Sequence, residues 1–235
     1  MPCLLHGWRW IVRSALAVAA GAVPACPAPA ATIAVVPIRI ELNSAASFCS
    51  LHVSNHGQDR VAIQVRGFAW SQLPDGTDRL DPADIRVNPS IMELGPGQRR
   101  LVRCSLPPHP GATESAYRLL LDEVPRANPA LGTMQTVLRL SVPIFRKPTG
   151  AAPQLQWKAA GAGTLELSNA GGMHAVVGKL IVSRAGLGPE TIERGFYLLA
   201  GARRTIALAG DTARVTKVEA VAGSGQAAVV AKVED

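Results

Sequence analysis

The segment "YRLLLDEVP", Tyr117–Pro125, favours an all-β interpretation of the chain. Tyr, Leu and Val suit a half-buried strand, and a closing Pro ends regular strand pairing. Because side chains alternate between the two faces of a strand, Arg118 lies on the same face as Leu120. A permanently charged guanidinium beside buried leucines requires an anionic partner. The segment therefore predicts a strand, and it raises the question of which anion Arg118 meets.

The composition sets the class of protein. The chain has 235 residues, 48% of them hydrophobic and 17% charged, which is enough for one large or two ordinary domains with a real core. Its net charge is +7, but the basic residues are scattered singly, with pairs only at 99–100 and 203–204. Aromatic residues make up only 4%. This distribution argues against nucleic-acid binding.

The N-terminus has the features of a secretory signal. Arg9 and Arg13 precede an apolar run over residues 14–23, and Ala-Pro-Ala follows at 28–30. A charged region, a short apolar region and a small-residue cleavage site are typical of a signal peptide. We expect residues 1–31 to be removed, with cleavage after Ala30 or Ala31. An uncleaved anchor and a lipoprotein signal at Cys26 are the alternatives, and the preceding Pro fits the second poorly.

Cys49 and Cys104 remain after removal of the signal. Two cysteines in an exported chain are compatible with a disulfide or with two buried free thiols.

Short strands and turns follow one another along the rest of the chain. The strands expected before residue 147 are 32–42, 47–55, 60–70, 99–106, 116–124 and 132–145. Residues 146–154, "RKPTGAAPQ", form a Pro/Gly/Ala-rich boundary. Further short strands are expected at 155–159, 163–169, 174–183, 195–200, 203–208, 213–221 and 227–234. This spacing predicts two β-sandwich domains in series.

No combination of residues supports catalysis or metal binding. His52 and His56 are four residues apart, about 13 Å on a strand, which is too far for one shared ion. His109 and His174 lack neighbours at ligand spacing, and the acidic pair 122–123 falls on opposite strand faces. The sequence also lacks a nucleophile elbow and a phosphate-binding loop. We therefore expect no enzyme activity, no metal, no cofactor and no small-molecule substrate.

Two isolated arginines on apolar strands remain to be explained. Arg39 lies between two isoleucines in "PIRIEL", and Arg118 lies beside leucines. Each arginine is compatible with a solvated position, with an internal salt bridge, or with an external anion; the internal candidates are Glu41, Asp122 and Glu123. The strand at 132–145 places Met134, Thr136, Leu138, Leu140 and Val142 on one face. Such a strand suits either a core or the addition of a partner's strand, with an arginine fork for the partner's carboxylate.

Five segments in order resemble the periplasmic chaperones of chaperone–usher pilus assembly. They are "VVPIRIEL" (35–42), "LHVSNHGQDRVAIQVRGFAW" (51–70), "LDPADIRVNPSIMELGPGQRRLVR" (80–103), "YRLLLDEVP" (117–125) and "VLRLSVPIF" (137–145). The last two are most similar to the archaic branch, which is associated with spore-coat-protein-U-like subunits. Residues after 150 resemble the family's second domain less sharply.

The resemblance implies two immunoglobulin-like domains in a boomerang arrangement, at residues 32–148 and 149–235. It implies a periplasmic protein that completes pilin subunits with its own strand, by donor-strand complementation, and delivers them to an outer-membrane usher. The donor residues implied are Met134, Thr136, Leu138 and Leu140. An apolar edge strand also invites self-pairing, so a self-capped homodimer is expected as one form of the free chain.

The resemblance also assigns residues, with one departure. Arg39 matches the cleft arginine that holds the subunit's C-terminal carboxylate, but Pro143 stands where the better-known branch has a second cation, a lysine. Arg118 is the expected replacement, with Arg103 and Arg139 as competitors. Glu123 is expected to form a structural salt bridge with a nearby basic residue.

The resemblance would place the two cysteines on neighbouring strands of one immunoglobulin-like sheet, Cys49 on the second strand of that fold and Cys104 on its fifth.

Two other functions are compatible with the same sequence. The first is an exported two-domain adhesion or scaffold protein of similar fold. The second is a periplasmic metal-handling or hydrolytic protein.

Overall fold

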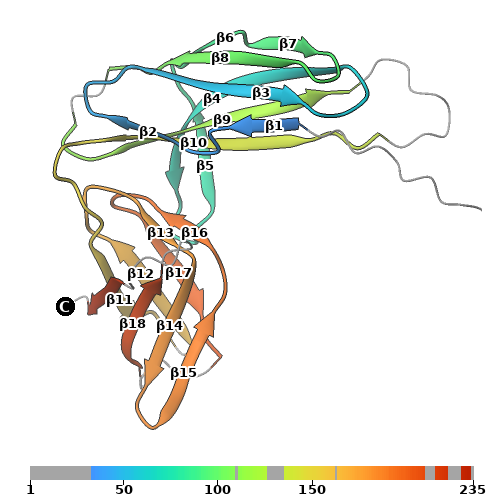
Figure 1. Cartoon of the computed structure of the whole chain (residues 1–235). Helices are drawn as coiled ribbons and strands as arrows, with labels where there is room; N and C mark the ends of the chain where they lie inside the picture. The colour runs from blue at the N-terminus through green and yellow to red at the C-terminus, as the bar shows by residue number, and fades with distance from the viewer. Residues whose placement is uncertain are drawn as a thin grey trace, which may run out of the picture.

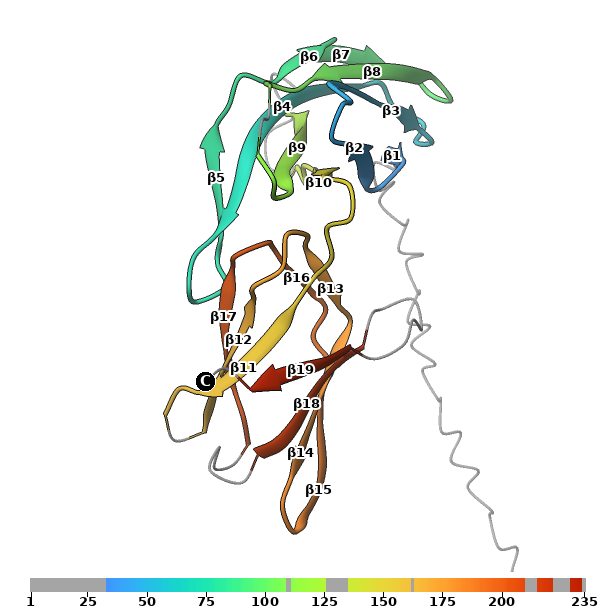
Figure 2. The ribbon, with the colours of Figure 1, turned by 90° about the vertical axis from the view of Figure 1, so that its left-hand side faces the viewer.

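The computed structural model describes residues 33–108, 111–125, 135–161, 163–209, 215–221 and 229–233. Within these ranges the regular elements are strands, numbered β1 to β19, and no helix is long and apolar enough to cross a membrane. Figures 1 and 2 show two lobes that meet at an angle, with β1 to β10 in one and β11 to β19 in the other. The expected all-β architecture of two domains in a bent arrangement is confirmed.

Two sheets face each other in the first domain. One has the order β1 (Ile33–Val36), β3 (Phe48–Asn55), β8 (Arg99–Ser105), β6 (Arg86–Asn88). The other has the order β2 (Ile40–Asn43), β10 (Arg139–Lys147), β9 (Ser115–Val124), β4 (Val61–Gln72), β5 (Asp78–Pro82), and β7 (Ile91–Leu94) also pairs with β4. The sequence analysis did not expect β5, β6 and β7 as strands, because they lie in stretches rich in Pro, Gly and Asp.

The first strand region changes sheets at Pro37. β1 pairs antiparallel with β3, whereas β2 runs parallel to the end of β10, with Ile40 opposite Ile144. The peptide bond between Val36 and Pro37 is cis, and Pro37 has no N–H to offer a ladder. One short segment therefore ties both sheets together.

The core of the first domain lies between its two sheets. Tyr117, Leu119 and Leu121 of β9 point into it, so Arg118 and Leu120, which share one face as the sequence predicts, face outward. The sulfur atoms of Cys49 and Cys104, directly opposite each other on β3 and β8, form a disulfide. The structure thus contains the bonded form of the two alternatives.

The second domain has its own core between a large and a small sheet. The large sheet has the order β15 (Leu187–Ile192), β14 (Lys179–Arg184), β18 (Val215–Val221), β19 (Val229–Val233), β11 (Leu155–Ala159), β12 (Thr164–Asn169), β17 (Arg203–Ala207). The small sheet pairs β13 (Ala175–Val177) with β16 (Phe196–Leu198). The single strand expected at 174–183 is wrong, since it breaks at Gly178 into β13 and β14, and β15 was not expected.

Aromatic side chains from both domains form the seam between them. Phe145 of β10 is fully buried and stacks on His174 of the second domain, with ring centroids 3.6 Å apart. Trp70 of β4 meets Tyr197 of β16 edge-on at 5.6 Å. Leu199 completes this buried cluster. Apolar contact of this kind stabilises one relative placement of the two domains.

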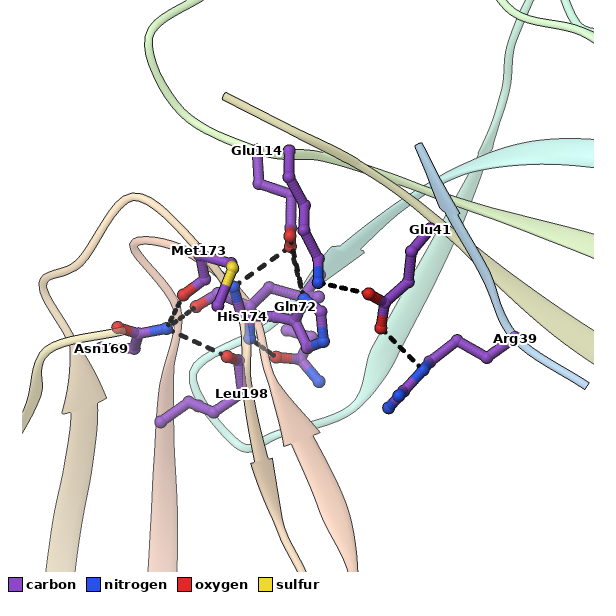
Figure 3. Close-up of polar contacts among 10 residues, drawn as sticks. Arg39, Glu41, Gln72, Glu114, Asn169, Met173, His174 and Leu198 are labelled. Carbon is purple, nitrogen blue, oxygen red and sulfur yellow. Dashed lines mark hydrogen bonds and ion pairs between the residues drawn. The ribbon is translucent and has the colours of Figure 1, made fainter. Parts of the chain in front are cut away.

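Polar contacts fix the same seam (Figure 3). Both oxygens of the Glu114 carboxylate lie within 2.9 Å of His174 Nδ1, and Oε1 also accepts the backbone N–H of His174. Gln72 donates to the carbonyl of Tyr197 and accepts the N–H of Leu199. In the second domain, the side-chain amide of Asn169 donates to the carbonyls of Met173 and Leu198 and so fixes the residues next to the seam. His174, which appeared in the sequence as an unpartnered turn residue, is a structural residue of the seam.

We predict that His174→Ala lowers the free energy of unfolding by about 3–5 kcal/mol, because it leaves a buried carboxylate with only the backbone N–H of residue 174 as a partner among the described residues. Glu114 and His174 are only 1% and 3% exposed, so water cannot replace the lost contact without rearrangement. Urea unfolding followed by tryptophan fluorescence measures the change. Adding Glu114→Gln to the His174→Ala variant removes the stranded charge and restores part of the loss. A loss below about 1 kcal/mol in the single variant contradicts a stabilising role for the pair.

Candidate functional site

The outward face of the β2-β10-β9 sheet brings the two arginines singled out from the sequence into one row. Pro143 is directly opposite Arg118 on β9. On the other side of β10, the parallel ladder with β2 begins with Ile40 opposite Ile144, and Arg39 is the residue just before it. Arg39 and Arg118 therefore flank the position where the resemblance expects a lysine.

Arg39 belongs to a cluster with one carboxylate (Figure 3). Its Nε lies 3.0 Å from Glu41 Oε1, and Lys147 Nζ lies 2.6 Å from Glu41 Oε2. The hydrogen bond from Lys147, and the attraction of Lys147, Arg39 and His174, outweigh burial and hold the pKa of Glu41 below its ordinary value. The three charged side chains are 27–41% exposed, so this cluster remains open to an anion from outside.

The sequence analysis found Glu41 as a partner for Arg39 but did not find Lys147. Lys147 lies four residues after Pro143, near the end of β10, and no alignment with a motif indicated it. The parallel register with β2, which brings these residues together, cannot be derived from alternation alone.

Arg118 has a different environment. Its guanidinium lies 2.8 Å from Asp78 Oδ2, donates to Ser141 Oγ at 3.0 Å, and covers the ring of Trp70 at 3.7 Å. Its Nε is buried without a hydrogen-bond partner within the part of the chain that the structure describes. Burial, partly opposed by Asp78, lowers the pKa of Arg118.

Asp78 was not among the internal partners considered for Arg118. It ends the segment "LPDGTD" (73–78), which the sequence analysis interpreted as a turn. The turn exists, but it joins β4 to β5 and places Asp78 opposite Gln72 on β4, from where its carboxylate reaches across β4 to Arg118.

The competing arginines are placed as follows. Arg139 and Arg66 both pair with Asp122 on the outward face, and their hydrogen bonds outweigh burial and lower the pKa of Asp122. Arg103 is opposite Ser50 in the other sheet, so it does not belong to this face.

The Glu123 carboxylate accepts the backbone N–H of Leu138 at 3.2 Å and has no basic partner in the described ranges.

The expected donor strand is only partly a strand. β10 begins at Arg139, so Thr136 and Leu138 precede it, and Met134 lies outside the described residues. Thr136 is exposed, whereas Leu138 and Leu140 are half-buried. The expected start at 132 is therefore too early for residues 135–138. Leu138 still accepts the backbone N–H of Glu123 at 2.9 Å, but regular pairing with β9 begins only at Arg139, opposite Asp122.

One edge of β10 is half covered. β9 pairs with β10 over residues 139–146, but β2 pairs only with residues 144–147. On the β2 side, residues 139–143 have no strand partner among the described strands. The free backbone groups of this segment form a template for an added strand, next to the cation cluster at Arg39.

Within the described residues, no group of three or more His, Cys, Asp or Glu side chains could hold a metal ion. His52 lies in β3 and His56 lies beyond the end of that strand.

Comparison with known proteins identifies the family. The family of pili and flagellar-assembly chaperones, PapD N-terminal domain, matches residues 32–152, more than half of the chain. No curated protein matches the chain in sequence.

Solved structures extend the similarity over both domains. One is the CsuC–CsuE chaperone–tip adhesion subunit complex from the archaic chaperone–usher Csu pili of Acinetobacter baumannii, with a TM-score of 0.70 and 22% identity over 87% of this chain and 100% of that one. Another is the Escherichia coli chaperone DraB, with a TM-score of 0.61 and 17% identity over 87% and 97%. A third is the SafA pilin–SafB chaperone complex of Salmonella enterica, with a TM-score of 0.60 and 16% identity over 86% and 92%.

These likenesses show the fold, and the family match shows the relationship. The family is one of assembly chaperones and not of enzymes. The chain belongs to the PapD-like family of chaperones for pilus assembly by the chaperone–usher pathway.

Proposed function

We propose that the protein binds pilin subunits in the periplasm by donor-strand complementation and delivers them to an outer-membrane usher. The observation that carries this proposal is the open edge of β10 at residues 139–143, directly beside the cluster around Arg39. Similar folds occur in complexes with a tip adhesion subunit and with a pilin.

Strand addition at this edge supplies affinity through backbone hydrogen bonds, and alternate side chains supply specificity. Leu138 and Leu140 are half-buried and retain apolar area for a subunit groove. Met134 and Thr136, which precede β10 in the sequence, are the other proposed donor residues. Pairing with the subunit would also extend β10 back over residues 135–138, which form no regular strand in the free chain.

The subunit's terminal carboxylate is proposed to bind on the outward face next to this edge. Arg39 and Arg118 flank Pro143 and offer guanidinium forks, which match a carboxylate bidentately. Lys147 adds a third cation on the Arg39 side, through the shared Glu41. Arg39 is the more accessible of the two arginines, because Arg118 is only 16% exposed.

The location and branch are part of the same proposal. The signal-like residues 1–31 lie outside the described residues, and the Cys49–Cys104 disulfide suits an oxidising compartment such as the periplasm. The archaic branch is proposed from the segments at 117–125 and 137–145. In the absence of a subunit, the open edge of β10 could be covered by a second copy, which gives the self-capped homodimer.

We predict that Arg39→Ala weakens binding of a peptide with the subunit's C-terminal sequence by about 10–100-fold, as expected for loss of about 1.5–3 kcal/mol of charge-assisted hydrogen bonding. Titration calorimetry measures the affinity, and co-purification with the co-expressed subunit gives a second readout. Arg118→Ala tests the second arginine. The control is Arg60→Ala, which removes an exposed arginine paired with Glu93, away from the row. Wild-type affinity in both Arg39→Ala and Arg118→Ala would contradict the proposal that these arginines bind the subunit's terminal carboxylate.

A substitution on the donor face separates strand donation from general surface effects. We predict that Leu138→Asp abolishes recovery of the subunit complex, because it introduces a charge where a groove must take an apolar side chain. Val137→Asp is the matched control, since Val137 is exposed and alternation in the donor strand would direct it to the opposite face. Thermal unfolding of each free variant checks that the chaperone is folded. Equal recovery with both aspartates contradicts donor-strand complementation by this segment.

Glu41 pairs with Arg39 and Lys147, the cations next to which the subunit carboxylate is proposed to bind. We predict that Glu41→Gln tightens binding of the same C-terminal peptide by up to about fivefold, which corresponds to removal of an exposed ion pair worth about 1 kcal/mol or less. Glu93→Gln, which breaks an exposed pair elsewhere, should leave the affinity unchanged. Weaker binding by Glu41→Gln would mean that this carboxylate positions Arg39 and does not compete with the subunit.

A further inference from the structure

A polar cavity of about 380 Å³ lies between the two domains on the Arg118 side of the aromatic seam. The first domain contributes residues from β4, the turn after it, β5 and β9. The second contributes residues 194–197 and Arg204 of β17. The full lining is Trp70, Gln72, Gly76, Asp78, Arg118, Arg194, Gly195, Phe196, Tyr197 and Arg204.

The lining carries more positive than negative charge. Three of its residues are arginines and one, Asp78, is an acid. Asp78 pairs with Arg118, whereas Arg194 and Arg204 form no ion pair within the described ranges. Burial and the charge of Arg194 lower the pKa of Arg204, with Asp78 and the exposed Asp75 opposing them. The two arginines of the second domain therefore repel each other without a full counter-charge.

Aromatic rings hold two of the guanidinium groups in fixed planes. Arg118 covers Trp70 at 3.7 Å, and Arg204 covers Phe196 at 4.6 Å. Stacking occupies the flat face of a guanidinium and leaves its in-plane N–H donors for hydrogen bonds. Donors held in place in this way lose little side-chain entropy when an anion binds.

We propose that this cavity is an oxyanion site that takes a phosphate, sulfate or carboxylate group and links the two domains through it. Planar forks of N–H donors suit the oxygens of such groups better than they suit a halide. The formal charge of the lining, three arginines and one aspartate, matches a group with one or two negative charges. Because Arg194 and Arg204 come from the second domain and the other lining charges from the first, a bound oxyanion holds the domains at one angle.

The cavity is distinct from the proposed anchor at Arg39, and phosphate can bind in it when no subunit is present. Only Arg118 is shared between them, so the test uses the arginines of the second domain. The oxyanion has two sources, a free ion or an acidic group of a bound subunit, and both present the same oxygens.

The experiment titrates the mature chain with inorganic phosphate, with chloride at equal ionic strength as the reference. The melting temperature and titration calorimetry are the two readouts, because a ligand that binds only the folded state raises the melting temperature. We expect phosphate to stabilise the wild type above chloride, and Arg194→Ala and Arg204→Ala each to weaken phosphate binding at least tenfold. Arg203→Ala is the matched control: it is adjacent in sequence, more than half exposed, and directed to Glu166.

Subunit binding, measured with and without phosphate, then identifies the source. Competition between phosphate and the subunit indicates an acidic group of the subunit, and simultaneous binding indicates a free ion. The proposal is overturned if phosphate stabilises no more than chloride does, or if it stabilises the Arg204→Ala and Arg203→Ala variants equally. Failure of the Arg39 anchor leaves this result unchanged, because no subunit takes part in the phosphate titration.

Discussion

The parallel pairing of β2 with only the last four residues of β10 is the constraint on which the candidate site depends. If β2 ran further along β10, the edge at residues 139–143 would be closed to any other strand. If β2 were absent, Arg39 and Glu41 would not lie beside Pro143 and Lys147. The change of sheet at Pro37 sets the length of this pairing, because the chain pairs with β3 before Pro37 and can pair with β10 only after it. The open edge and the cation cluster therefore have one structural origin.

The second domain lies at a fixed position next to this site, because the seam holds it against β10. Phe145 belongs to the same strand as the open edge, and it is buried against His174 of the other domain. The outward row at Pro143 is only two residues away from this contact. Side chains on the row therefore face the angle between the domains seen in Figures 1 and 2, and the angle is fixed by aromatic packing and by the buried Glu114–His174 pair.

Alternation along strands predicted much of the fold, because each long strand has one face in a core. It placed Arg118 and Leu120 on one face of β9, and it placed Cys49 and Cys104 on neighbouring strands once the family was recognised. It failed for β15, whose Gly188, Pro189 and Glu190 interrupt the apolar pattern, and at Gly178, where one apolar run contributes to two sheets. It also could not pair charges across the fold. Asp78 and Lys147 reach their partners through a hairpin return and a parallel register, and neither has a local signal.

The change of sheet at Pro37 has an effect on the opposite sheet as well. β1 covers β3 only over residues 52–55, so the first half of β3, from Phe48 to Leu51, has β8 as its single described neighbour. Phe48 at the start of this half is largely exposed. Cys49 lies in this half, and its disulfide to Cys104 joins the strand covalently to β8. The disulfide thus resists fraying of the half of β3 that is hydrogen-bonded to β8 alone. The first domain can therefore leave the edge of β10 open without also losing the edge at β3.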